Sequence, residues 1–305
     1  MDLGRYLAAR QRQIDRALAR HLDAITGSGP LSRAMRHGLL GGGKRIRPIL
    51  CLAAAEAVGQ PARSVLGYAC AIELVHAYSL IHDDLPAMDD DQLRRGRPTT
   101  HVVYGEAVAI LAGDALLTEA FHLIARQSLR SLASQQGLRI VAELGQAAGS
   151  LGMVAGQAED ILGEQRRLGA AAVEAIHRRK TGALIRAAVR IGAIAASASP
   201  AALRALTRYG DHLGLAFQIA DDILDDQGAP AITGKSPQRD RERNKSTFVT
   251  ALGLRRAQAR GEEELRLAER ALRSFGEPAE PLRALVRHVV GRARAAASVD
   301  GQQTR

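Results

Sequence analysis

Apolar residues recur every three or four positions along nearly the whole chain, which is the spacing that places them on one face of an α-helix. This pattern predicts helices over 2–24, 31–40, 48–58, 64–85, 103–133, 138–163, 171–198, 200–226, 245–274 and 279–297. No segment alternates apolar and polar residues as a half-buried strand does. The fold class is therefore expected to be all-α.

The longest segment without helical periodicity, residues 227–244, contains two prolines, two glycines and many charges. A loop of this length inside a compact domain is either disordered or a functional lid. Lys235 and Lys245 bracket its second half, and this favours the lid.

Composition favours one domain with a core of small aliphatic side chains. The chain has 305 residues, of which 46% are hydrophobic and only 3% are aromatic. This length is within reach of one large helical fold. We expect residues 1–305 to form a single domain, with residues 290–305 as a flexible tail because that segment is less apolar.

No signal for membrane insertion or secretion is evident. Every apolar run is interrupted by Gly, Arg, Glu or Asp before it reaches the roughly 20 residues that span a bilayer. The N-terminal segment lacks the apolar centre of a signal peptide. Cys51 and Cys70 lie in apolar helical patterns, where reduced buried thiols are expected. The sequence thus predicts a cytoplasmic protein without a membrane span.

The net charge of +10 suits nucleic acid, an anionic membrane surface or a polyphosphate ligand. A basic helical nucleic-acid-binding protein is the distant alternative, although aromatic residues for stacking on single strands are scarce. Of the 42 basic residues only four are lysines, which leaves 42 − 4 = 38 arginines. Lysine is a compact point charge that the planar arginine fork cannot always replace. The four lysines, Lys44, Lys180, Lys235 and Lys245, are therefore candidate functional residues.

Two groups of aspartates are the main chemical feature of the chain. The first contains Asp83, Asp84, Asp89, Asp90 and Asp91, and the second contains Asp221, Asp222, Asp225 and Asp226. Like charges four residues apart cost a helix roughly 0.2–0.5 kcal/mol per pair unless a cation neutralises them. Carboxylate clusters without His or Cys favour hard ions, and Mg²⁺ typically binds through a few carboxylates plus substrate phosphates. We expect the two groups to face each other across one metal site.

Three cations follow the glycines at 41–43 and precede the helix predicted to start at Pro48. Lys44, Arg45 and Arg47 could form an anion cradle there, because free backbone N–H groups at a helix N-terminus favour negative charge. The spacing does not match the nucleotide P-loop, and a solvated loop is the alternative.

Several motifs together resemble one known family. They are GGGKRIRP (41–48), HAYSLIHDDLPAMDDDQLRRGRPT (76–99), GDALL (113–117), GQAED (156–160), KTGALIRAAV (180–189) and FQIADDILDD…GK…KST (217–247). In this order they resemble the bacterial trans-prenyltransferases, or polyprenyl synthases, and most nearly the farnesyl diphosphate synthases. The resemblance covers residues from about 40 to 253.

The resemblance implies an isoprenoid-synthase-type bundle of about ten helices around a central cavity. It also implies condensation of dimethylallyl or geranyl diphosphate with isopentenyl diphosphate to give farnesyl diphosphate. Geranylgeranyl and geranyl diphosphate synthases are the nearest alternatives, since they differ in tunnel depth. The family is usually homodimeric, and no nucleic acid is expected as a partner.

The family's functional residues transfer by motif. Asp83, Asp89 and Asp221 resemble the ligands of three Mg²⁺ ions, with Mn²⁺ as an alternative ion, and Asp84, Asp222 and Asp225 resemble neighbouring or further ligands. The allylic diphosphate contacts would be Arg94, Lys180 and Lys235, and the isopentenyl diphosphate pocket would be Lys44, Arg47, His76 and Arg95. Lys180, Thr181 and Gln218 resemble the groups that stabilise the carbocation. Gln157 and Asp160 match a motif that lines the cavity.

Product length is predicted from the residues before Asp83. In the family an aromatic residue at the position of Tyr78 closes the tunnel floor and stops growth at fifteen carbons. Helical geometry places Ser79 more directly beneath Asp83 than Tyr78. Both residues are therefore candidates for setting the chain length.

Overall fold

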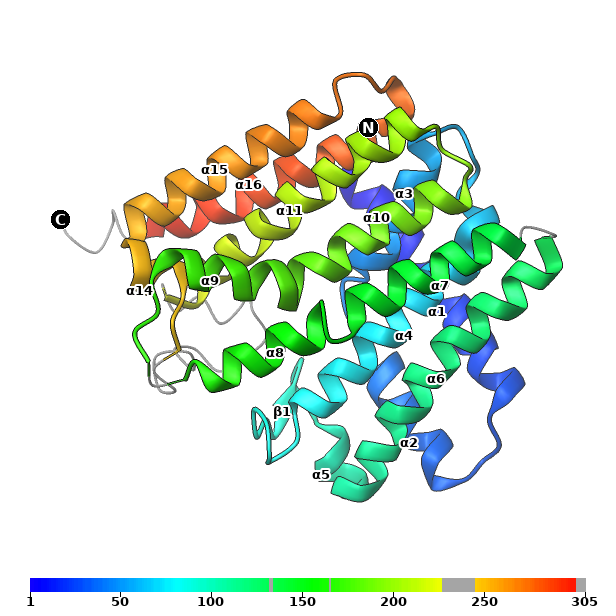
Figure 1. Ribbon diagram of the computed structural model, residues 1–305. Coiled ribbons are helices and arrows are strands. Elements are labelled where there is room, and N and C mark those ends of the chain that lie inside the picture. Colours follow the sequence, from blue (N-terminus) through cyan, green and yellow to red (C-terminus); the bar gives the residue numbers. More distant parts are fainter. Residues whose placement is uncertain (132–133, 165, 227–244, 300–305) are drawn as a thin grey trace.

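The protein is almost entirely helical (Figure 1). The computed structural model describes residues 1–131, 134–164, 166–226 and 245–299. Its α-helices are α1 (Leu3–Ile25), α2 (Pro30–Leu40), α3 (Ile46–Ala57), α4 (Leu66–Asp83), α5 (Thr100–Tyr104), α6 (Glu106–Ser131), α7 (Ser134–Ala148), α8 (Met153–Leu162), α9 (Ala170–His177), α10 (Ala183–Ala195), α11 (Pro200–Asp226), α14 (Phe248–Leu252), α15 (Leu254–Ala271) and α16 (Glu280–Val299). Short helical turns are η1 (Ala62–Val65), η2 (Arg178–Gly182) and η3 (Glu277–Ala279). The all-α expectation is confirmed.

Glycines divide three of the predicted helices. The 103–133 prediction splits at Gly105, whose φ of +82° is in the region that favours glycine, and the 245–274 prediction splits at Gly253 with φ +80°. The 138–163 prediction is wrong as one helix, because a turn at 149–152 separates α7 from α8. In each case the apolar periodicity continues across the break, so the pattern alone joined two helices.

One small β-hairpin was not predicted. Leu93–Arg94 (β1) pairs antiparallel with Arg97–Pro98 (β2), and Arg95 and Gly96 form the turn with positive φ values. Strands of two residues are too short to show an alternating pattern. The hairpin matters because it carries both arginines of the first acidic motif.

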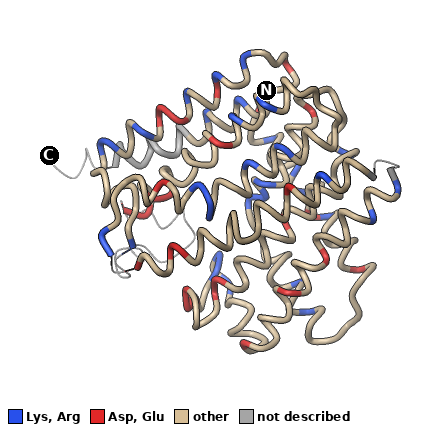
Figure 2. The backbone as a smooth tube through the Cα atoms, in the orientation of Figure 1, with Lys and Arg blue, Asp and Glu red and all other residues tan. Residues whose placement is uncertain are grey.

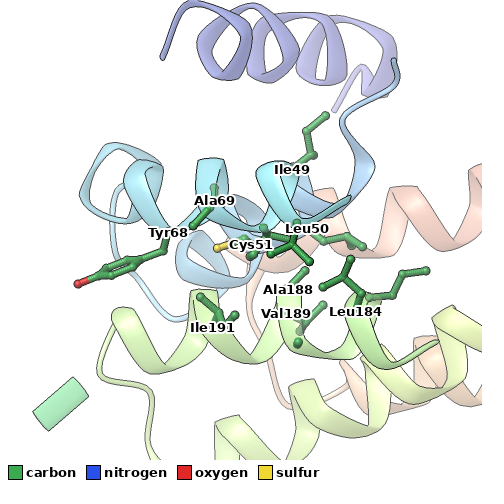
Figure 3. Close-up of a cluster of buried hydrophobic side chains, with 14 of the residues drawn as sticks. Ile49, Leu50, Cys51, Tyr68, Ala69, Leu184, Ala188, Val189 and Ile191 are labelled. Carbon is green, nitrogen blue, oxygen red and sulfur yellow. The ribbon is translucent and has the colours of Figure 1, made fainter. Parts of the chain in front are cut away.

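The core lies where α10 packs against α3, α4, α7 and α11 (Figure 1). Figure 3 shows part of it, with labelled side chains from α3 (Ile49, Leu50, Cys51), α4 (Tyr68, Ala69) and α10 (Leu184, Ala188, Val189, Ile191). Most of these side chains are small or aliphatic, as the composition predicted, and both cysteines are buried and reduced. Small residues allow helix axes to approach closely.

Two helical segments of the described chain, Ala62–Asp83 and Glu106–Arg130, are long and apolar enough on average to span a membrane. The sequence analysis did not find them because polar residues and glycines interrupt both. The first is a core helix, since 67% of its apolar window is buried in the protein. The second is only 39% buried and exposes Ile110 and Leu111. One or two helices of this length and apolarity are weak evidence for a membrane span.

Two glycines hold three segments unusually close at the predicted site. A Cβ atom on Gly156 of α8 would overlap the backbone nitrogen of Lys180 in η2. A Cβ on Gly214 of α11 would lie 2.8 Å from the Cα of Gly182. Segment η2 is a π-helical turn inside the predicted 171–198 helix, and such turns are frequent at functional sites. The close packing brings α8, η2 and α11 together around Lys180.

The predicted tail is partly helical, and the predicted lid lies outside the described residues. Helix α16 continues to Val299, past the expected start of the tail at residue 290. Residues 227–244, including Lys235, lie outside the described residues.

Candidate active site

The three cations after the glycine loop do not share one role. Arg45 has a left-handed φ of 51° as the N-cap of α3, and its side chain turns into the protein. Its Nε donates to Asp15 at 2.8 Å, Nη1 donates to Glu73 at 2.7 Å, and Nη2 donates to the Leu39 carbonyl at 2.8 Å. The expectation that Arg45 helps to bind an anion is therefore wrong. Its charge is already neutralised by Asp15 and Glu73.

Arg47 is the second residue of α3, and its side chain contacts His76 of α4. Its Nη1 donates to Nε2 of His76 at 3.3 Å, and its buried Nε has no hydrogen-bond partner in the part of the chain that the structure describes. Burial lowers the pKa of Arg47, although the charges of Glu73 and Asp221 oppose this. Within the described ranges Arg47 forms no ion pair. Its guanidinium is thus available to an anionic ligand.

His76 is a neutral neighbour of these cations. Burial is the largest cause that holds its pKa well below the ordinary value, and the charges of Arg47, Arg95, Arg94 and Arg45 act in the same direction. A neutral imidazole can accept a hydrogen bond from Arg47 while its other nitrogen donates. The structure therefore brings His76 and Arg47 together, as the resemblance implied.

The hairpin carries Arg95 to the glycine loop. Its side chain donates to the Gly42 carbonyl, and a Cβ on Gly43 would overlap its guanidinium. Burial lowers the pKa of Arg95, and the charge of Arg45 adds to this effect. Lys44 is exposed in the same loop. Of the predicted isopentenyl diphosphate contacts, Arg47 and Arg95 thus lie close enough to His76 for their charges to act on it.

Beside the hairpin lies a small pocket of ≈ 40 Å³, between α2 and the end of α4. Arg94, Arg95 and Arg97 line it together with Asp84 and Gly38. Its lining is therefore continuous with the cationic side of the site.

The first acidic group divides into buried and partly exposed carboxylates. Asp84 and Asp91 are 3% and 2% exposed, and Arg94 binds both, with Nε at 2.7 Å from Oδ1 of Asp84 and Nη2 at 3.4 Å from Oδ2 of Asp91. Asp83 and Asp89 are only partly buried and are joined by a 2.7 Å hydrogen bond from the Asp89 N–H to the Asp83 carbonyl. Asp83 and Asp89 are thus better placed for a ligand than Asp84, and Arg94 is already engaged by carboxylates.

A network of lysines and carboxylates joins α8, η2 and the segment before α14. Lys180 Nζ donates to Oδ2 of Asp160 at 2.6 Å. Lys245 Nζ lies 3.4 Å from Oδ1 of Asp89 and 3.4 Å from the same oxygen of Asp160. Burial acts to raise the pKa of Asp160, but the two lysines outweigh it and the pKa is lowered. The network links the first acidic group to Lys180.

A second chain of hydrogen bonds fixes the predicted carbocation-stabilising groups. Thr181 Oγ1 donates to Oε1 of Gln218 at 2.7 Å, and Gln218 Nε2 donates to Oδ1 of Asp222 at 2.9 Å. The other Asp222 oxygen accepts the Phe248 N–H at 2.8 Å. Asp222 is 3% exposed. It therefore orients Gln218 and anchors the start of α14, whereas its neighbour Asp221 is partly exposed.

The donor chemistry fits Mg²⁺ carried by a phosphate ligand. Among the described residues no group of three or more His, Cys, Asp or Glu side chains could hold a metal ion by itself. The donors would be carboxylates on two separate segments, which suits a hard ion whose remaining ligands are phosphate oxygens and water. Gln157 is 9% exposed, and both of its side-chain polar atoms lack a partner in the described chain. Such orphaned atoms are consistent with a ligand that the site is built to bind.

The two chain-length candidates lie below the first acidic group. Tyr78 is 6% exposed and its ring packs edge-on against His82 with centroids 5.8 Å apart. Burial raises the pKa of Tyr78, and the charge of Asp83 adds to this. Ser79 is partly buried and donates to the His76 carbonyl at 3.0 Å.

The site also contains residues for which sequence reasoning gave no exact role. Lys245 was noted only as a flank of the predicted lid, and the pairing of Asp160 with Lys180 was not expected. The scarcity of lysine was the signal that singled out Lys180 and Lys245, but it did not identify their partners. Figure 2 shows acidic segments gathered toward the end of the bundle where α8, α9 and α14 lie, with basic segments among them.

Comparison with known proteins identifies a family and several related chains. The sequence model of the family described as polyprenyl synthetase matches residues 29–280. A farnesyl diphosphate synthase from Geobacillus stearothermophilus is 44% identical over 274 residues, which are 90% of this chain and 92% of that protein. A chloroplastic geranylgeranyl pyrophosphate synthase from Catharanthus roseus is 40% identical over 295 residues, which are 95% and 82% of the two chains.

A solved structure has the same fold. The crystal structure of a geranyltransferase from Legionella pneumophila superposes with a TM-score of 0.86 at 33% identity, covering 96% of this chain and 98% of that one. The sequence match and the shared all-α fold agree with each other. The chain belongs to the polyprenyl synthetase family.

Proposed function

We propose that this protein is a transferase that condenses dimethylallyl or geranyl diphosphate with isopentenyl diphosphate to give farnesyl diphosphate, in a Mg²⁺-dependent reaction. The observation that carries the proposal is Arg47, a partly buried guanidinium that forms no ion pair within the described residues. It lies beside a neutral His76, and the charge of Asp221 acts to raise its pKa. A cation in this setting stabilises an anionic substrate.

Isopentenyl diphosphate would bind at the glycine loop. Arg47 and Arg95 would donate charge-assisted hydrogen bonds to its diphosphate, with Lys44 at the exposed edge. His76 would donate a further hydrogen bond as a neutral imidazole, which is not an acid that could protonate the substrate. The low pKa of His76 supports this role.

The allylic diphosphate would bind between the two acidic groups. Asp83, Asp89 and Asp221 would hold three Mg²⁺ ions there, with Mn²⁺ as a substitute and with Asp225 as a further donor. When bound, the metal stabilises the negative charge that develops on the departing diphosphate. Lys180 and Lys235 would contact the diphosphate directly. Arg94 would also hold the first acidic group in place through its hydrogen bonds to Asp84 and Asp91.

The developing allylic cation needs fixed dipoles and protection from water. Thr181 and Gln218 would direct oxygen atoms toward it, and their orientation is supported by the hydrogen bonds that end on Asp222. Asp222 would act through Gln218 rather than as a metal ligand. We assign the final proton transfer to the departing diphosphate, as in the family.

Farnesyl diphosphate is favoured over longer products by Tyr78, which would close the tunnel below Asp83, with Ser79 lining it. Geranylgeranyl diphosphate is the alternative product, since a geranylgeranyl synthase is also similar to this chain. Geranyl diphosphate is a further alternative. These products differ only in how far the tunnel extends.

The whole chain would act as one catalytic domain in a cytoplasmic homodimer. The exposed apolar side chains of α5 and α6 support dimerisation: Val102, Val103, Ile110, Leu111 and Leu129. Exposed apolar side chains in excess of the usual scatter often mark a protein interface. Sedimentation analysis of the wild type and of Leu111→Glu would test this, and an unchanged monomer in both would contradict it.

Incubating the purified protein with Mg²⁺, isopentenyl diphosphate and either dimethylallyl or geranyl diphosphate tests the activity. The expected product is farnesyl diphosphate from both allylic substrates. A twenty-carbon product would select the geranylgeranyl alternative. An absence of condensation would overturn the enzyme assignment.

A further inference from the structure

Lys245 is enclosed by acidic side chains from two different segments. Its Nζ lies 3.4 Å from Oδ1 of Asp89, 3.4 Å from Oδ2 of Asp160 and 3.6 Å from Oε1 of Glu164. Asp89 comes from the loop after α4, whereas Asp160 and Glu164 come from α8 and the turn that follows it. One ammonium group therefore connects the first acidic group to α8.

These contacts are protected from solvent. The side chains of Lys245, Asp89 and Asp160 are 11%, 13% and 13% exposed, and that of Glu164 is 28% exposed. Ion pairs that are this enclosed are screened less by salt than exposed pairs. Among the described residues, Lys180 also pairs with Asp160, so a second ammonium adjoins the same cluster.

The distances are longer than an ideal charge-assisted hydrogen bond, which is about 2.7–2.9 Å. The ammonium thus occupies a position between the carboxylates instead of binding one of them tightly. A cation held in this way keeps the carboxylates together, and each loose contact can later be broken at a small cost in free energy. A divalent ion that binds Asp89 competes with it for the same oxygen atoms.

We propose that Lys245 is a positioning residue that acts as a resident cation, holding Asp89 and Asp160 together before substrate binds and opposing the binding of divalent metal to Asp89. This inference rests on the proposed function only in assigning Asp89 to the metal. The metal therefore binds weakly to the free protein. It binds more tightly once a diphosphate is present, because the diphosphate supplies further metal ligands and an alternative partner for the ammonium.

The test is binding of Mn²⁺ to the protein without any diphosphate, measured by electron paramagnetic resonance of the free ion. Lys245→Met is expected to bind Mn²⁺ at least about fivefold more tightly than the wild type, the lower end of usual coupling between two sites. Lys245→Arg keeps the charge and is expected to bind at most as tightly as the wild type.

Arg179→Gln is the matched control. Arg179 of η2 pairs with Glu159 of α8, the helix that also carries Asp160, but both side chains are over 40% exposed. Its loss removes the same charge without opening the enclosed carboxylates, so Mn²⁺ affinity should stay near the wild-type value. If Arg179→Gln and Lys245→Met tighten binding equally, the effect is general charge and the proposal fails.

A second measurement covers the case in which Lys245→Met is less stable. Mn²⁺ is then expected to raise the melting temperature of Lys245→Met more than that of the wild type, because the metal replaces the missing cation. Equal Mn²⁺ affinity and equal thermal shifts in both proteins would overturn the proposal. None of these measurements uses turnover, so a failed condensation assay leaves the result interpretable.

Discussion

Arg45 and Arg47 lie two residues apart, and replacing each by Met should have opposite effects. Arg45 is 4% exposed and pairs with Glu73, which is 2% exposed. These partners outweigh burial and raise the pKa of Arg45. Burial lowers the pKa of Arg47, so the fold disfavours its charged form. Arg45 therefore stabilises the fold, whereas Arg47 is retained at a cost to stability.

The magnitudes follow from these environments. Breaking a buried ion pair and leaving one charge uncompensated costs about 3–5 kcal/mol. Arg45→Met should thus lower the melting temperature by on the order of 10 °C. Arg47→Met should leave it unchanged or higher. Loss of a hydrogen bond to a charged group costs about 1.5–3 kcal/mol. The KM for isopentenyl diphosphate in Arg47→Met should therefore rise roughly 10- to 150-fold.

The assay compares thermal unfolding and steady-state kinetics of both variants with the wild type. The KM for the allylic diphosphate is the internal control, since Arg47 is assigned to the other substrate. A double substitution, Arg45→Met with Glu73→Gln, should recover part of the lost stability because no charge is left unpaired. The reasoning is refuted if Arg47→Met destabilises as much as Arg45→Met while the KM for isopentenyl diphosphate does not change.

Three further predictions test other parts of the site. Tyr78→Ala should lengthen the product beyond fifteen carbons, as judged by chromatography of the dephosphorylated products, whereas Tyr68→Ala, near the start of the same helix, should not; an unchanged product in the first variant removes the tunnel-floor assignment. Gly156→Ala should lower kcat by up to about 100-fold, because the added Cβ displaces the backbone of Lys180; a wild-type kcat in a folded variant would show that this contact is not needed. His76 has a lowered pKa, so below the ordinary value of 6.5 the unfolded chain binds a proton that the folded chain does not, and stability should fall with decreasing pH by at most about 1.4 kcal/mol per unit. His76→Asn should flatten this acid limb in denaturant titrations, and an unaltered slope would contradict the assignment.

The sequence determined the helical class and the chemistry of the site. Apolar periodicity marked nearly every helix, because a helix that packs on a core must bury one face. The two aspartate groups and the four lysines could be identified without coordinates, since such residues are costly in apolar surroundings unless a partner neutralises them. The breaks at Gly105 and Gly253 were missed because periodicity continues across them.

Only the tertiary structure decided which charged residue does what. Arg45 and Arg47 look equivalent in the sequence, but the left-handed backbone at Arg45 turns one inward to Glu73 and leaves the other facing His76. Asp222 is enclosed and orients Gln218, whereas the adjacent Asp221 stays partly exposed. These roles depend on distances between segments far apart in the chain, such as Asp89 and Lys245. Local pattern cannot contain such distances, because they are set by how the helices pack.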